Sequence, residues 1–402
     1  MKKGAISLTL VVCFAFLPVL RAQENWSKAL TFVVTADMRY FTKGPYLNSR
    51  HFLGLVQAVK TIGPGSFMVS PGDCDPPDDV RDVISMVLGQ DYPWYPVMGN
   101  HELESTTRIT NMEWLRNLNK AGTSLPRIVR KGPANAEETT YSFDWANCHF
   151  VSLNLFYDGK SDSITKYNVV PELLSWLESD LAANNKKHIF VFGHMPMLSI
   201  PDMDNGRLRN VGDCLDRYPQ NDLKFQQLLS KYKVSAYFCG HTHDTSFANI
   251  NGVWQLDAGH ARGIEEAAPE EWFEICSKLV EDGTRKGIST EEAFSEYFKA
   301  SRGNADAVRR AIFLMNLGEG ATSEKSIADP VSIRGFGNFY VQYKQGGASR
   351  DALLKAYWEN ISFARSTFIK VSAGKEKVKV EYYRDDGRGG PYSLRHTLIL
   401  DR

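Results

Sequence analysis

Short runs rich in β-branched and aromatic residues alternate with segments of helical periodicity between residues 30 and 259. This alternation is typical of an α/β fold. Proline or Asn-Asp start signals predict the helices Val80–Leu88, Glu172–Ala183 and Leu223–Tyr232. The expected strands are Leu30–Ala36, Ser66–Ser70, Trp94–Met98, Cys148–Leu153, His188–Phe192, Val234–Cys239 and Val253–Leu256.

The sequence changes character after residue 263. Residues 269–317 are rich in Glu, Lys, Ala and Arg without a strand pattern, which predicts helices. Further strands are expected at Phe339–Tyr343, Phe368–Val371, Val378–Tyr383 and Leu394–Leu400. We therefore expect a core over residues 23–263, a helical insertion or subdomain over 264–330, and a C-terminal β region over 331–402 that could complete the core sheets.

The N-terminal residues predict export. Lys2 and Lys3 precede an apolar run from Ile6 to Leu20, and the small residue Ala22 follows, as in a secretory signal peptide. The run is shorter than the roughly 20 residues that span a bilayer, and no later stretch is long and apolar enough. We expect residues 1–22 to be removed, leaving a periplasmic or extracellular protein without a transmembrane segment.

Side chains of the kinds that bind metal ions follow the predicted strands. The carboxyl ends of the strands in an open α/β sheet border its binding crevice, so these side chains are expected to meet there. A single Gly-Asp is an ordinary turn in most proteins, but five such groups in order are not. The groups are Asp37, Gly72-Asp73, Gly99-Asn100-His101-Glu102, Gly193-His194 and Gly240-His241-Thr242-His243.

The donor types indicate the class of metal. Carboxylate and amide oxygens combined with imidazole nitrogens suit Zn, Mn or Fe(II) better than Ca or a thiolate-preferring metal. A carboxylate such as Asp73 can bridge two cations about 3.5–4 Å apart, as in two-metal hydrolases. One or two divalent transition metals are therefore expected as cofactors.

The five groups together resemble the signature of the calcineurin-like metallophosphoesterases over residues 30–259. The resemblance implies a four-layer αββα sandwich of two mixed sheets flanked by helices. It implies an enzyme that hydrolyses phosphomonoesters or phosphodiesters with a metal-activated water, and that His101 stabilises developing charge or protonates the leaving oxygen. It also implies two ligand sets that share Asp73, namely Asp37, Asp73 and His243 for one metal and Asp73, Asn100, His194 and His241 for the other.

The first group departs from the family pattern. The family has Asp-x-His, whereas this chain has Asp37-Met38-Arg39, and arginine does not lose its proton to become a ligand. The first site could still bind its metal weakly, with water or Asp75 in place of the missing ligand, or it could remain empty. Alternatively, Arg39 could bind the substrate phosphate. A structural ion pair of Arg39 is a further alternative, and we expect a weakened first metal site. Pro76 stands where purple acid phosphatases of this family carry an iron-binding tyrosine, so no tyrosinate-to-iron colour is expected.

The sequence gives few indications of the substrate. A phosphate ester is the expected partner, and the equal totals of 47 basic and 47 acidic residues give no indication of nucleic-acid binding. The alternative function is a secreted binding protein on a catalytically weakened scaffold of this family. Candidate substrate-reading residues are Arg207, Arg209, Arg217, His260 and Arg262, although the sequence favours a solvated loop around the first three.

Overall fold

The computed structural model describes residues 25–38, 48–104, 108–120, 125–204, 210–261, 281, 283–288, 366–385 and 391–401. No helix in these ranges is long and apolar enough to cross a membrane. The predicted signal segment, most of the predicted helices of 264–330, the strand Phe339–Tyr343 and the side chains Arg39, Arg207, Arg209 and Arg262 lie outside the described residues.

Two mixed β-sheets form the centre of the fold. The first consists of β1 (Leu30–Val34), β2 (Met68–Ser70), β3 (Trp94–Pro96), β11 (Thr367–Ala373), β12 (Val378–Arg384) and β13 (Ser393–Leu400). The second consists of β4 (Ile128–Lys131), β5 (Tyr141–Trp145), β6 (Cys148–Ser152), β7 (His188–Phe192), β8 (Ala236–Cys239), β9 (Thr245–Ile250) and β10 (Val253–Ala258). Their strand orders are β13-β12-β11-β1-β2-β3 and β4-β5-β6-β7-β8-β10-β9.

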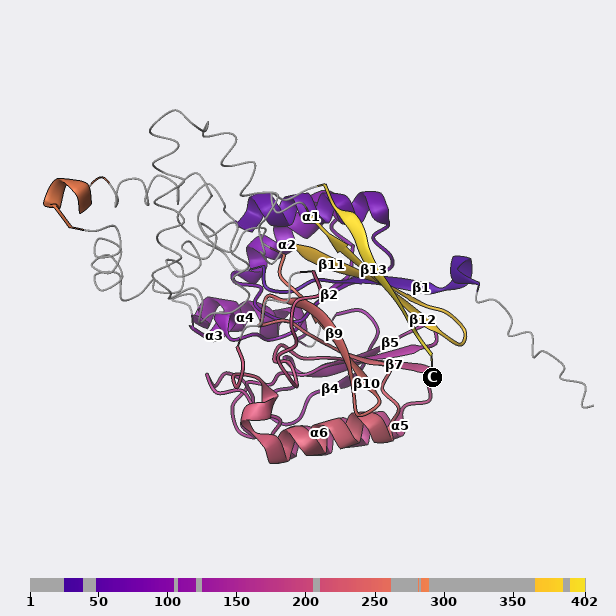
Figure 1. The fold of residues 1–402 in the computed structure, drawn as a ribbon. Helices are drawn as coiled ribbons and strands as arrows, with labels where there is room; N and C mark the ends of the chain where they lie inside the picture. Colours follow the sequence, from indigo (N-terminus) through magenta and orange to yellow (C-terminus); the bar gives the residue numbers. More distant parts are fainter. Residues whose placement is uncertain are drawn as a thin grey trace, which may run out of the picture.

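Helices cover the outer faces of both sheets (Figure 1). α1 (Asn48–Ile62) and α2 (Pro77–Leu88) lie on the first sheet, and α5 (Pro171–Ala183) and α6 (Pro219–Lys231) lie on the second. The shorter helices are α3 (His101–Glu104), α4 (Arg108–Leu118), η1 (Trp26–Lys28) and η2 (Leu215–Arg217). This arrangement confirms the predicted αββα sandwich.

The alternation of side chains along each strand produces the three apolar layers of the sandwich. In β1, Phe32 and Val34 face the second sheet, whereas Val33 packs with the residues of α1 and α2. Phe32 lies 5.3 Å from Phe67 and 5.2 Å from Phe150 between ring centroids, so aromatic rings fill the space between the sheets. Burying a side chain such as Phe stabilises the fold by about 1.5–3 kcal/mol.

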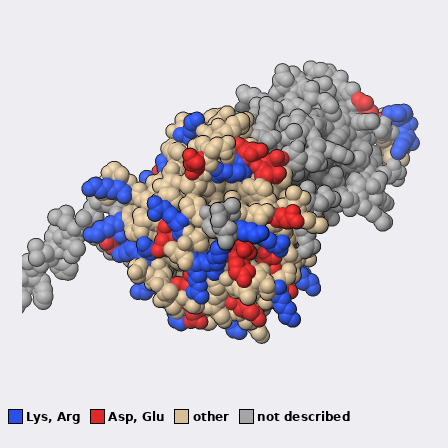
Figure 2. Space-filling model, turned by 180° about the vertical axis from the view of Figure 1, so that it is seen from behind, with Lys and Arg blue, Asp and Glu red and all other residues tan. Residues whose placement is uncertain are grey.

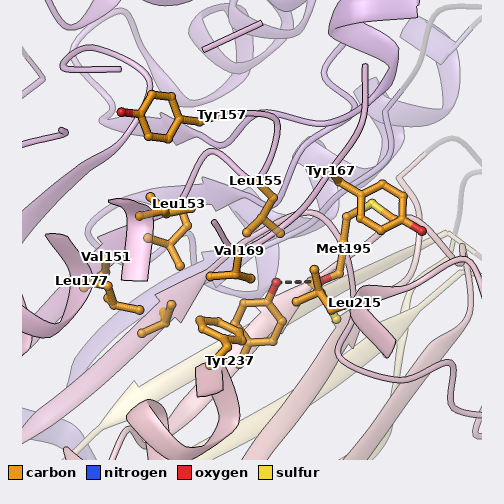
Figure 3. Packing of buried hydrophobic residues seen from close by; sticks show 14 of the residues in the cluster. Val151, Leu153, Leu155, Tyr157, Tyr167, Val169, Leu177, Met195, Leu215 and Tyr237 are labelled. Carbon is orange, nitrogen blue, oxygen red and sulfur yellow. Dashed lines mark hydrogen bonds between the residues drawn. The ribbon is translucent and has the colours of Figure 1, made fainter. Parts of the chain in front are cut away.

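The outer layer of the second sheet holds the start of the loop after β7 in place (Figure 3). Tyr237, on β8, is fully buried in the cluster that packs against α5 and α6. Its hydroxyl donates a hydrogen bond of 2.6 Å to the carbonyl of Met195, directly after His194. The position of His194 is therefore fixed by the packing of the neighbouring strand.

The C-terminal strands belong to the first sheet. β11 pairs antiparallel with β1, with Leu30 opposite Ala373, and β12 and β13 extend the sheet beyond it. The fully buried Arg384 on β12 donates hydrogen bonds of 3.0 and 2.9 Å to Asp202, which lies in the loop that follows His194. The last strands thus support a loop of the core.

The outer surface carries charges of both signs. Figure 2 shows acidic and basic side chains interspersed over the face seen there, which agrees with the equal totals of 47 basic and 47 acidic residues. The side chains of Cys74, Cys148, Cys214 and Cys239 are buried.

Several elements were not predicted from the sequence. α1 and α4 were missed, as were the strands β4, β5 and β9. Among the described strands, β4 is a partly exposed edge strand that pairs with β5, and it carries Arg130 and Lys131, so it lacks a continuous apolar run. The expected strands and helices that fall in described ranges are present with shifts of a few residues at their ends.

A buried histidine bridges two carboxylates in the second sheet. His149 on β6 bonds through Nδ1 to Asp144 at 2.8 Å and through Nε2 to Asp180 at 2.9 Å. Burial alone would lower the pKa of His149, but the hydrogen bonds and charges of Asp180 and Asp144 outweigh it and raise this pKa above its ordinary value of 6.5. The protonated imidazole therefore stabilises the folded state.

This contribution to stability is expected to depend on pH. It is complete below about pH 6.5, the unfolded-state pKa, and is lost as pH rises through the raised folded-state pKa. Its size should be about 1.5–3 kcal/mol, as for hydrogen bonds to charged groups. The free energy of unfolding is measured in urea with a chelator present, at about pH 6 and at about pH 9. Its decrease between these two pH values should be larger in the native protein than in His149→Gln. Equal losses in the two proteins would contradict this role of His149.

Candidate metal centre

The predicted ligand residues meet at the carboxyl ends of the central strands. β1, β2 and β3 run parallel in one sheet, and β7 and β8 run parallel in the other. The loops after these strands therefore project to the same edge of the sandwich. All six predicted ligands lie in described ranges, and contacts link them into one cluster.

Asp37, Asp73 and His243 form one part of this cluster. Each offers a ligand atom, and these atoms lie within 4.8 Å of one another. His243 Nε2 is 3.3 Å from Asp37 Oδ1, and all three side chains are buried. This is the set that the family resemblance assigns to the first metal.

The second part is arranged around Asn100. Its Oδ1 lies 3.0 Å from His194 Nε2 and 3.3 Å from His241 Nδ1. His194 Nε2 is also 3.3 Å from Asp73 Oδ1, so Asp73 contacts both parts of the cluster. His194 Nδ1 lies 2.8 Å from the carbonyl of Pro71, to which it donates, and this leaves Nε2 of a neutral imidazole available as a ligand.

The backbone is held in a sparsely populated conformation at four of these ligands. Asp37, Asp73, His241 and His243 have φ values of 56°, 57°, 69° and 58°. Asp and His enter this left-handed region more readily than most residues, but each such residue still costs on the order of 1–3 kcal/mol. Four such residues in one cluster indicate that the fold maintains this arrangement for function.

Glycines permit the close approach of the ligand loops. A Cβ on Gly99 would lie 2.3 Å from both the backbone nitrogen and Oδ1 of Asp73. A Cβ on Gly240 would lie 2.3 Å from Asp37 Oδ2. The glycine before each of these motifs is therefore required so that a ligand of another loop can occupy that space.

Glu102 supports the cluster from behind, a role that the sequence did not reveal. Its carboxylate accepts hydrogen bonds from the backbone nitrogens of Gly99 at 2.9 Å, Asp73 at 3.3 Å and Cys74. Burial and the neighbouring Asp73 carboxylate raise the pKa of Glu102 to about 8. The only signal in the sequence was its place as the last residue of Gly-Asn-His-Glu.

His101 differs from the other histidines of the centre. Its backbone nitrogen donates to Asp73 Oδ1 at 3.0 Å, and its Nε2 lies 3.8 Å from Asp73 Oδ2. The His101 side chain is 28% exposed, whereas those of His194 and His243 are 0% and 5% exposed. His101 is therefore the histidine of the centre that solvent and a substrate reach most easily.

The residues present fit a divalent transition metal. Asp37 and Asp73 bring two buried carboxylates close together, with ligand atoms within 4.8 Å, where their mutual repulsion is strong without a compensating cation. Oxygen and imidazole nitrogen donors match the preferences of Zn, Mn and Fe(II). The small spaces left by Gly99 and Gly240 allow ligands from both sheets to converge on the same region.

The other predicted residues lie around this cluster. Asp75 Oδ1 accepts a hydrogen bond of 2.8 Å from Asn111, and it is not part of the Asp37–Asp73–His243 set. His260 is buried, with its ring centroid 5.9 Å from that of His243. Arg217 bonds to Asp213 at 3.2 Å.

Comparisons with known proteins identify the family of the chain. Residues 28–245 match the model of the calcineurin-like phosphoesterase family, so the chain belongs to that family. The family is metal-dependent, and the chain is a phosphoric ester hydrolase.

Individual relatives are similar to this chain over more than half its length. Tartrate-resistant acid phosphatase type 5 of Oryctolagus cuniculus is 26% identical over 254 residues, which cover 59% of this chain and 74% of the relative. The protein of the same name from Mus musculus is 25% identical over 273 residues, covering 61% and 76%. The solved structure of PhoD is 10% identical with a TM-score of 0.46, covering 92% of this chain and 70% of that one.

Proposed function

We propose that this protein is an exported phosphatase that hydrolyses phosphomonoesters, with phosphodiesters as poorer substrates. The observation that carries the proposal is the convergence of six residues with oxygen or nitrogen donor atoms, Asp73 among them, with the partly exposed His101 at their edge. The similarity to acid phosphatases supports a monoester substrate.

The metal supplies a water of lowered pKa and charge stabilisation at phosphorus when it is bound. The residues of the chain hold the geometry in which this chemistry takes place. Asp73 accepts the backbone N–H of His101 at 3.0 Å, which fixes the imidazole beside the ligand sets. From there, the His101 imidazole can donate a hydrogen bond or a proton to the oxygen that leaves phosphorus.

A panel of chromogenic esters tests the proposal. The metal-reconstituted protein should hydrolyse p-nitrophenyl phosphate with a higher kcat/KM than bis(p-nitrophenyl) phosphate. A preference for the diester would overturn the monoester assignment, and no hydrolysis of either ester would favour the binding-protein alternative.

The two metal sites are expected to differ in affinity. Arg39 stands in place of a ligand of the first set, whereas the second set is complete in the sequence. We therefore predict one tightly held transition metal per chain and a second that dialysis removes. Elemental analysis after gel filtration checks this, and Arg39→His should retain the second metal because imidazole is a good ligand for these ions. Two stoichiometric metals in the native protein would contradict the prediction.

Export rests on the sequence of the N-terminus. Lys2, Lys3 and the apolar run Ile6–Leu20 support cleavage near Gln23. N-terminal sequencing of the mature protein from its native host tests this, since a retained Met1 would exclude processing.

A further inference from the structure

Asp213 approaches the metal centre from the loop between β7 and α6. Its Oδ1 accepts hydrogen bonds from the hydroxyl of Tyr167 at 2.7 Å and from Arg217 Nη1 at 3.2 Å. Its other oxygen, Oδ2, lies 3.7 Å from His241 Nε2. The carboxylate is therefore held on one side and faces a predicted metal ligand on the other.

The two ring nitrogens of His241 face different groups. Nδ1 lies 3.3 Å from Asn100 Oδ1, on the side of the ligand set. Nε2 is buried and has no hydrogen-bond partner among the described residues, and the Asp213 carboxylate lies just beyond hydrogen-bonding distance of it. A movement of a few tenths of an ångström would close this contact, and contacts of this kind often tighten when a site is loaded.

The same loop also contacts the backbone of His241. Asn210 Nδ2 donates a hydrogen bond of 3.2 Å to the carbonyl of His241, and the backbone nitrogen of Asp213 donates to the carbonyl of Asn210 at 2.9 Å. The loop thus bonds to the main chain of His241 and places a carboxylate beside its ring. A simple exposed ion pair between Asp213 and Arg217 would explain neither contact.

We propose that Asp213 is a positioning residue for the metal centre, an inference that rests on the proposed function. Asp213 accepts a hydrogen bond from the Nε2–H of neutral His241, and this tautomer leaves Nδ1 unprotonated toward the metal. Metal-binding histidines commonly give their second ring nitrogen to a carboxylate in this way, which fixes the tautomer and the ring orientation. Tyr167 holds Asp213 in the required position.

The test is the metal affinity of Asp213→Asn. The metal-depleted protein is titrated with Mn²⁺ by calorimetry, and the absorption spectrum of the Co²⁺-substituted protein is recorded. Loss of such a carboxylate commonly weakens metal binding about 10–100-fold, so one Mn²⁺ site should weaken by this factor and the Co²⁺ bands should shift. Tyr167→Phe, which keeps the carboxylate but removes one of its two hydrogen-bond donors, should weaken the same site by a smaller factor.

Glu178→Gln is the matched control. Glu178 is 49% exposed like Asp213, and it pairs with Lys231 at 2.6 Å on the outer helices. Glu178→Gln removes the same charge as Asp213→Asn, but away from the metal centre. Its metal affinity and Co²⁺ spectrum should therefore equal those of the native protein.

The outcomes separate this inference from the proposed function. If Asp213→Asn and Tyr167→Phe bind Mn²⁺ like the native protein and only the melting temperature falls, Asp213 is structural and the inference is wrong. If the native protein itself binds neither Mn²⁺ nor Co²⁺, the proposed metal-dependent function fails first.

Discussion

Replacing His101 with alanine is expected to lower kcat by about 10²–10⁴ while the metal content stays unchanged. The imidazole is partly exposed at the edge of the ligand cluster, and it contacts Asp73 mainly through its backbone nitrogen. The variant therefore removes a proton donor or charge stabiliser without opening a metal site, and the expected loss is the range for such a group.

Elemental analysis and steady-state kinetics on the same His101→Ala sample check this prediction. Metal loss from the variant together with unchanged turnover of the remaining holoenzyme would show that His101 is a ligand. A kcat equal to that of the native protein would remove His101 from the chemistry altogether.

Asp73→Asn is expected to have the larger effect. It should lose both metals, and its kcat/KM should fall by at least about 10⁴, beyond the range that a single proton donor or charge stabiliser supplies. Asp73 belongs to the Asp37–His243 set and also lies 3.3 Å from His194 Nε2, so it contacts both ligand sets. Asparagine tolerates the positive φ of 57° at this position and keeps an oxygen for the backbone of His101, which limits damage to the fold.

Asp180→Asn is the control for this variant. Asp180 is also a buried carboxylate that contacts a histidine, since it lies 2.9 Å from His149, but it belongs to α5 on the outer side of the second sheet. This variant should lose stability and keep its metals. If Asp73→Asn retained both metals in stoichiometric amounts, Asp73 would not be a shared ligand.

The ligand motifs could be predicted because residues of metal-binding types directly follow the predicted strands. A single group of this kind is an ordinary turn, but five of them in order at strand ends indicate a metal site. The structure brings Asp37, Asp73, Asn100, His194 and His241 into one cluster with His243. The sandwich fold followed from the family resemblance rather than from periodicity, and the family match over residues 28–245 confirms it.

Supporting residues were harder to find because their role depends on contacts between distant segments. Glu102 acts through three backbone nitrogens in two loops. Asp213 is exposed and belongs to no recognisable sequence motif. Arg384 lies 182 residues from Asp202 in the sequence, and nothing in its local sequence predicts a buried ion pair. α1 was missed although its residues have helical periodicity. β4 was missed because an edge strand needs only one apolar face, so its residues show no continuous apolar run.

The most direct test of the account is a metal titration of the depleted protein during hydrolysis of p-nitrophenyl phosphate. The account predicts no turnover in excess chelator, activity that rises in step with the metal bound, and no such rise in Asp73→Asn. Full turnover in the chelated protein, or tight metal binding without any hydrolysis, would contradict the claim that this cluster is the centre of a metal-dependent phosphoester hydrolase.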